Sequence, residues 1–159
     1  MSEKKEMLKT VAENTFGRCD RAFKDLTEKE IEWRPVPESN NIRWILIHLS
    51  WQWNVGIPRM IKGDPNYKPA GWPDDYAESN PSLQKLMSDL EKGKAAILSG
   101  IDDLSPVDLD AEIDLGRGKR KRLLMILGYL LEAVHHEGQV VMFRGNIRRR
   151  REKDKAFLV

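Results

Sequence analysis

Three histidines and one glutamate are the residues of this chain whose types and spacing suit metal chemistry. His135 and His136 lie within the apolar stretch LLEAVHHEGQVV, and His48 lies within a second apolar stretch, WILIHL. Glu132 precedes His136 by four residues, so both side chains lie on one face of a helix. An imidazole or carboxylate in an apolar segment needs a hydrogen bond, an ion partner or a metal, because removing it from water is otherwise unfavourable.

Two imidazoles and one carboxylate could hold a divalent metal, and Zn, Ni, Mn and Fe all accept such ligands. Three protein ligands would leave coordination positions open, as in catalytic sites. The residues alone equally allow a metal-free interpretation, in which Glu132 pairs with His136 and a backbone or hydroxyl group satisfies His48. His135 lies about 100° from His136 around the helix. We expect His135 to contact the ligand residues without binding the metal itself, or to replace Glu132 as a ligand.

The segments that must position these residues read as four long helices. Apolar residues recur there at steps of three and four, which is the helical pattern, over residues 3–25, 41–62, 81–103 and 121–145. The last segment is the most apolar and is therefore expected to be central. Four such helices without a large sheet predict an all-α fold, a four-helix bundle.

The connections between the helices are long and carry their own signals. Thr27 with Glu30 forms a capping box that starts a short helical turn. Pro58 predicts a kink or an end near residue 57. Residues 63–80 are rich in proline and glycine and predict a loop, and residues 110–120 predict a small hairpin before the last helix. Long crossover loops of this kind argue against simple up-down-up-down wiring.

Composition indicates one globular unit, with 40% hydrophobic and 33% charged residues. We place the bundle at residues 1–147 and a basic C-terminal tail at residues 148–159. No apolar run approaches the roughly 20 residues that a membrane helix needs, so we expect no membrane partner. Basic clusters occur at 117–122 and 144–155, but a net charge of +2 is too small for a nucleic-acid footprint. The single cysteine, Cys19, excludes an internal disulfide and suits the cytoplasm.

Tryptophan is frequent, and two interpretations of it stay open. We expect packing first, with each indole N–H directed to a partner; the alternative is an aromatic wall beside the metal. Three tryptophans fall in the second predicted helix and two in loops: Trp44, Trp51, Trp53, Trp33 and Trp72.

Three stretches together resemble the DinB/YfiT-like superfamily. Asn40–Leu49 (NNIRWILIHL) resembles the motif that carries that family's first metal histidine, and residues 26–35 resemble the segment before it. His136–Gln139 (HEGQ) resembles the H-R-G-Q motif of the last helix. The family usually has a histidine and an arginine where this chain has Glu132 and Glu137. The resemblance covers nearly the whole chain in order and length.

This resemblance implies a DinB-like bundle that forms a homodimer and holds a divalent metal through His48, Glu132 and His136. Several family members are thiol transferases or thiol-dependent isomerases and hydrolases. It therefore implies a metal-dependent transferase or hydrolase that joins a low-molecular-weight thiol or water to a small electrophilic substrate. The alternative is a non-catalytic stress-response or binding bundle with a structural or lost metal site. No catalytic or substrate-binding residue stands out, although Ser50 and Tyr129 are near in sequence.

Overall fold

The computed structural model describes residues 2–116 and 118–158. Three residues lie outside the described ones. They are Arg117 of the basic cluster at 117–122, residue 1 of the predicted bundle at 1–147, and residue 159 of the predicted tail at 148–159. The long helices are α1 (Glu3–Phe23), the continuous run of α3 (Ile42–Trp51), η1 (Gln52–Gly56) and α4 (Ile57–Lys62), then α5 (Leu83–Asp103) and α7 (Arg122–Lys153). The short elements are α2 (Glu28–Glu32), α6 (Pro106–Asp110) and the hairpin of β1 (Glu112–Asp114) and β2 (Lys119–Lys121).

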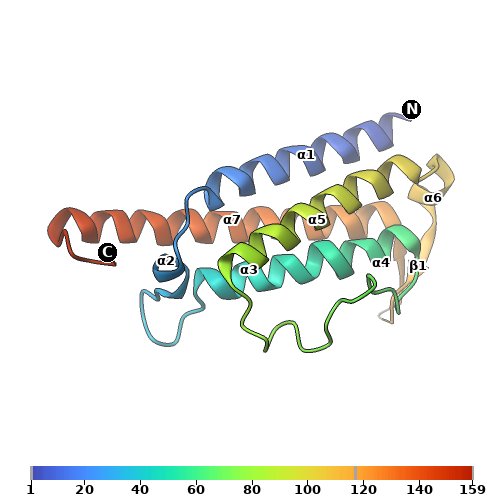
Figure 1. Cartoon of the computed structure of the whole chain (residues 1–159). Helices are drawn as coiled ribbons and strands as arrows, with labels where there is room; N and C mark the ends of the chain where they lie inside the picture. The colour runs from blue at the N-terminus through green and yellow to red at the C-terminus, as the bar shows by residue number, and fades with distance from the viewer. Residues whose placement is uncertain (1, 117, 159) are drawn as a thin grey trace.

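The wiring is not the simple alternating one, as predicted. Figure 1 shows α1 and α7 running in one direction, with α3–α4 and α5 both running in the other. The connection from α4 to α5, residues 63–82, therefore runs back along the bundle. It places two consecutive long helices parallel to each other. The all-α bundle and the small hairpin before the last helix are both confirmed.

The core lies between the four long helices. Helix α1 packs against α7 and α5, and the α3–η1–α4 run packs against α5 and α7. Trp53 is 1% exposed and meets Phe16 of α1 edge to face, with ring centroids 4.8 Å apart. Each fully buried large apolar side chain stabilises the fold by about 1.5–3 kcal/mol. This packing fixes which face of each helix points inward.

Side-chain caps set where the helices begin. The side chain of Asn41 accepts a hydrogen bond of 2.9 Å from the backbone N–H of Trp44, so α3 starts at a defined residue. The capping box predicted from Thr27 is present at α2. The third long helix begins two residues later than predicted, because Ser82 caps it. Its hydroxyl accepts from the backbone N–H of Lys85.

Proline widens the second long helix rather than ending it. Pro58 has no N–H to donate to the carbonyl of Asn54, and its ring crowds that carbonyl. In η1 the backbone is a π-helix, and the N–H of Ile57 bonds to the carbonyl of Gln52, five residues back. The wider turn carries the chain past the proline into α4. The predicted kink or end near residue 57 is thus a widened segment just before it.

Helix α7 continues to Lys153, well beyond the predicted end at residue 145. It has 32 residues and extends past the other helices at one end of the bundle (Figure 1). Arg151 forms an ion pair of 2.9 Å with Glu30, and the guanidinium of Arg150 lies over the ring of Trp33. These contacts hold the end of α7 against the α2 region, and α7 passes through residues 147 and 148 without a break. Across the described residues, no helix combines the length and apolarity needed to cross a membrane.

Candidate metal centre

Helices α3 and α7 bring the three predicted metal ligands together. One ligand atom each of His48, Glu132 and His136 lies within 4.8 Å of the other two. The Nε2 atom of His48 is 3.1 Å from Oε1 of Glu132, and Nε2 of His136 is 3.8 Å from the same oxygen. Residues separated by more than eighty positions in the sequence therefore meet at one point between two helices.

Trp44 holds the two imidazoles from one side. Its ring stacks on His48 with centroids 5.2 Å apart and planes at 8°, and it meets His136 edge-on at 5.8 Å. Trp44 lies one turn before His48 on α3, so the Asn41 cap that places Trp44 also sets the phase of the histidine. The tryptophan remains 42% exposed. It is thus part of the wall of the site and is not a core residue.

Gln139 orients His136 through its far ring nitrogen. The Oε1 atom of Gln139 is 2.8 Å from Nδ1 of His136, and its Nε2 atom is 3.1 Å from Nε2 of His135. The amide oxygen accepts from Nδ1–H of His136, which leaves a lone pair on Nε2 facing Glu132. His135 lies outside the group of three ligand atoms and contacts it through Gln139.

Gln52 is a member of the site that the sequence analysis missed. Its Nε2 atom lies 3.0 Å from Nε2 of His48, and the residue is 1% exposed at the start of η1. The Oε1 atom of Gln52 is buried without a hydrogen-bond partner among the described residues. Its position four residues after His48 on the same helix is the signal that could have found it.

The electrostatics of this cluster suit a cation. Burial, reinforced by the nearby His48, keeps the pKa of His136 below its ordinary value despite the hydrogen bond that His136 donates to Gln139 and the charge of Glu132. The neutral imidazole is the form that can act as a ligand. Two imidazole nitrogens and a carboxylate oxygen this close together present lone pairs to one another. A proton or a metal ion between them removes that repulsion.

The distances between the ligand atoms also fit a tetrahedrally coordinated metal ion. Bonds of about 2.1 Å in a tetrahedral arrangement separate ligand atoms by about 3.4 Å. The observed 3.1 and 3.8 Å, on either side of Oε1 of Glu132, bracket that value. Small side-chain adjustments would complete the set. The side chains of His48 and Glu132 are 29% and 42% exposed, so the site is open to solvent on one side.

A cavity of about 240 Å³ lies between the α3–η1–α4 run, α7 and the β1–β2 hairpin, and none of the three ligand residues lines it. Trp51 and Tyr129 line it, and each lies one helical turn from a ligand, His48 and Glu132 respectively. Gly56 also lines it, and a Cβ there would lie 2.9 Å from the Tyr129 ring. Trp44 is therefore the tryptophan that forms an aromatic wall beside the ligands, whereas Trp51 lines this cavity and Trp53 packs in the core.

The remaining sequence candidates lie elsewhere. Ser50 is fully buried, so it cannot contact a ligand at the open side of the site. Glu137, at the position where the resembled family has arginine, forms an ion pair of 2.8 Å with Arg18 of α1. Cys19 is a buried core residue, as expected. Burial, aided by Glu137 and Asp20, raises the pKa of the Cys19 thiol to about 12, which keeps it protonated.

Comparison with solved structures identifies the same fold. A DinB-like protein of Bacillus subtilis shares 12% identity and a TM-score of 0.66, over 86% of this chain and 89% of that one. A conserved protein of Enterococcus faecalis shares 18% identity and a TM-score of 0.65, over 91% and 96%. No curated protein matches the sequence. The sequence model of the DinB superfamily matches residues 12–140. The chain belongs to the DinB superfamily.

Proposed function

We propose that the protein is a divalent-metal-dependent enzyme in which His48, Glu132 and His136 hold the ion. The observation that carries the proposal is the meeting of these three ligand atoms within 4.8 Å at a half-exposed site. A three-ligand set with an open side is typical of catalytic rather than structural metal centres. Two imidazoles and one carboxylate accept Zn, Ni, Mn or Fe.

The chain's own residues provide the positioning. Gln139 holds His136 with Nε2 toward Glu132, and Trp44 restricts the ring of His48 by stacking. Outer groups of this kind raise metal affinity because they fix the ligands before the ion arrives. Glu132 contributes the one negative charge of the set, so the bound centre keeps a net positive charge.

The reaction class that we propose is transfer of a low-molecular-weight thiol, or of water, to a small electrophilic substrate. A bound divalent metal would supply Lewis-acid polarisation and a lowered thiol or water pKa. The cavity lined by Trp51 and Tyr129, each one helical turn from a ligand residue, gives room for a small substrate. We further propose that the protein acts in the cytoplasm, which a single buried cysteine suits, and as a homodimer. Exposed Leu124 and Leu131, seven residues apart on one face of α7, support the dimer.

Metal content tests the site directly. The protein is purified without a His tag, loaded with each metal in turn and dialysed, and bound metal is measured by elemental mass spectrometry. We expect about one ion per chain in the wild type and a loss of at least tenfold in affinity for His48→Ala, Glu132→Ala and His136→Ala. Glu112→Ala, which removes an exposed carboxylate of the hairpin, is the control and should keep its metal. Equal metal content in all five proteins would sink the proposed site.

Turnover separates the enzyme from the alternative, a non-catalytic bundle with a structural metal. The metal-loaded protein is screened for consumption of small thiols in the presence of electrophiles, with the Glu132→Ala protein as the blank. Thiol consumption that needs both the metal and Glu132 supports the enzyme. Stoichiometric metal that raises the melting temperature, with no thiol consumption or hydrolysis across the screen, favours the structural role.

A further inference from the structure

A second cavity lies where α7 extends past the C-terminal end of α1, and its lining is strongly basic. Its volume is about 690 Å³, within the range of small-molecule sites. Five arginines and one glutamate line it, and we call it the arginine pocket: Arg21, Arg144, Arg148, Arg149, Arg151 and Glu30. Five positive charges and one negative charge give its lining a net charge of +4. Such a concentration of one sign attracts anions.

The arginines differ in how far they are already occupied. Arg144 donates to the carbonyl of Ala22, and Arg151 pairs with Glu30. Arg149 donates one N–H to Asn146. Arg21 and Arg148 make no hydrogen bond or ion pair with any of the residues described. Two exposed guanidiniums of the pocket are therefore free to bind a ligand.

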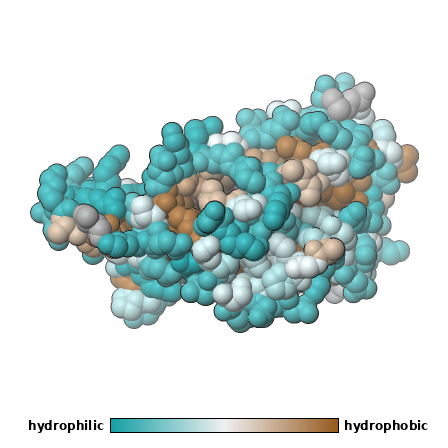
Figure 2. All heavy atoms as spheres, viewed as in Figure 1, coloured by the Kyte–Doolittle hydropathy of each residue, from teal (hydrophilic) through white to brown (hydrophobic). Residues whose placement is uncertain are grey.

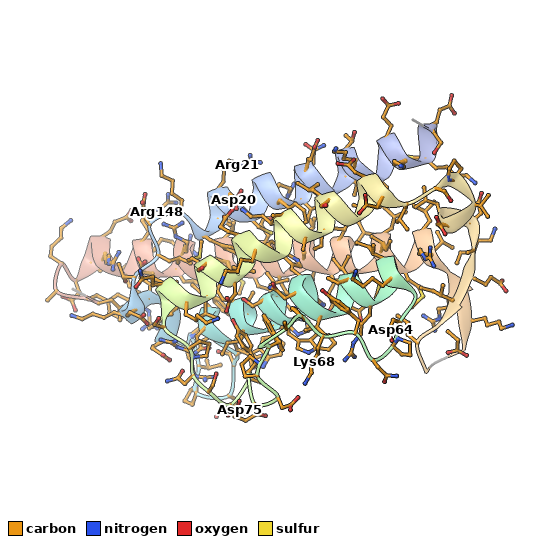
Figure 3. All side chains as sticks on the ribbon, turned by 45° about the vertical axis from the view of Figure 1, so that its right-hand side comes forward. Asp20, Arg21, Asp64, Lys68, Asp75 and Arg148 are labelled. Carbon is orange, nitrogen blue, oxygen red and sulfur yellow. The ribbon has the colours of Figure 1, made fainter. Side chains whose placement is uncertain are left out.

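The acidic groups nearby do not neutralise these two arginines. Asp20, next to Arg21, forms an ion pair of 2.6 Å with Lys94. Glu30 is taken by Arg151. Figure 3 shows Arg21 and Asp20 at the C-terminal end of α1 and Arg148 at the same end of the molecule on α7. The positive charge of the pocket thus stays uncompensated.

The floor of the pocket is apolar. Ala22, Val141, Met142 and Ile147 line it, and Val141 and Met142 are each 51% exposed. In Figure 2 apolar surface is visible between hydrophilic side chains where α7 emerges beyond α1. Guanidinium groups over an apolar floor match a molecule that has an anionic head and an apolar body.

We propose that the arginine pocket binds an organic anion, with a phosphate or carboxylate head on Arg21 and Arg148 and an apolar body on Val141 and Met142. Guanidinium groups bind both heads through paired hydrogen bonds. The apolar body is needed because exposed Val141 and Met142 gain from being covered. The pocket lies on the α1 side of α7, whereas the metal ligands face α3, so this binding does not depend on the proposed metal.

Fluorescence of anilinonaphthalene sulfonate, an apolar anion, tests the pocket in the full chain. We expect saturable binding that decyl phosphate or decanoate displaces, and the stronger of the two identifies the preferred head group. Arg21→Ala/Arg148→Ala should weaken binding at least about tenfold. Lys119→Ala/Lys121→Ala removes the same charge from the exposed hairpin and should bind as the wild type does.

A second pair of variants tests the apolar floor. Met142→Ser should weaken displacement by decyl phosphate about three- to tenfold, from the loss of one apolar contact. Met7→Ser, at a methionine of α1 that is 60% exposed against 51% for Met142, should not. Equal binding by the wild type and the double arginine variant would overturn the proposal. An equal loss of dye binding in the two double variants would also overturn it. So would displacement of the dye by inorganic phosphate as strong as that by decyl phosphate, or displacement by short duplex DNA and by no amphiphile.

Discussion

The close approach of α5 to η1 at Gly93 yields a sharp prediction. Glycine at this position of α5 lets the backbone of η1 approach, and a Cβ there would lie 2.6 Å from Cβ of Trp53 and 3.1 Å from its carbonyl carbon. Ordinary contact begins near 3.4 Å, so Gly93→Ala creates an overlap of roughly 0.8 Å against groups that are not flexible side-chain ends. Such overpacking costs about 3 kcal/mol, and the better helix propensity of alanine returns about 1 kcal/mol. We expect a net loss of about 2 kcal/mol in the free energy of unfolding.

Urea unfolding followed by far-UV circular dichroism measures this loss. Gly128→Ala is the matched control, because it also lies inside a long helix and its Cβ would meet nothing within 4 Å. The control should gain up to about 1 kcal/mol, so the two variants should differ by about 3 kcal/mol in opposite directions. In melting temperature a loss of 2 kcal/mol is about 4–8 °C for a chain of this length. A Gly93→Ala protein as stable as the wild type would refute the close contact between α5 and η1.

Cys19 and Tyr76 give two further predictions. Because the pKa of Cys19 is raised to about 12, above its unfolded value near 9, its contribution to stability is complete below pH 9 and is lost as the pH rises toward 12. Between these pH values the unfolding free energy of the wild type should therefore fall more steeply than that of Cys19→Ala, by up to about 1.4 kcal/mol per pH unit. A native Cys19 thiol that reacts with Ellman's reagent at pH 8 as fast as the thiol of the urea-unfolded chain would contradict its burial. Tyr76→Phe removes the 2.7 Å hydrogen bond to the buried carboxylate of Asp89 and should cost about 1–3 kcal/mol in urea unfolding. Tyr67→Phe, elsewhere in the same connection, is the control, and equal stability of the two variants would show that the buried bond contributes nothing.

Much of the fold could be predicted from local signals. The 3.6-residue apolar pattern located all four long helices, and the Thr27 capping box and the hairpin glycines marked two connections. These features are encoded within a few residues, so they need no knowledge of the rest of the chain. The end of α7 could not be found in this way. It depends on Arg151 meeting Glu30, which lies 121 residues away in the sequence.

The candidate site also has a part that local sequence predicts and a part that depends on distant contacts. The pair Glu132 and His136 follows from helical spacing, and His48 follows from its motif position. That the three ligand atoms meet depends on how α3 packs against α7, which no local pattern encodes. The buried Gln52 was missed although it lies four residues after His48, because that spacing alone does not show which neighbouring side chains point to the ligands.

That π-helical turn also affects how this protein is aligned with others. A π-turn holds one residue more than the α-helical turn it replaces, so the residues on its two sides are out of phase by about 100° relative to an uninterrupted α-helix. His48 lies before the turn and Pro58 lies after it. A relative with a plain α-helix here would match either the histidine or the proline in register, but not both. With such a relative, a one-residue gap between residues 51 and 57 restores the match, and an ungapped alignment slips at this position.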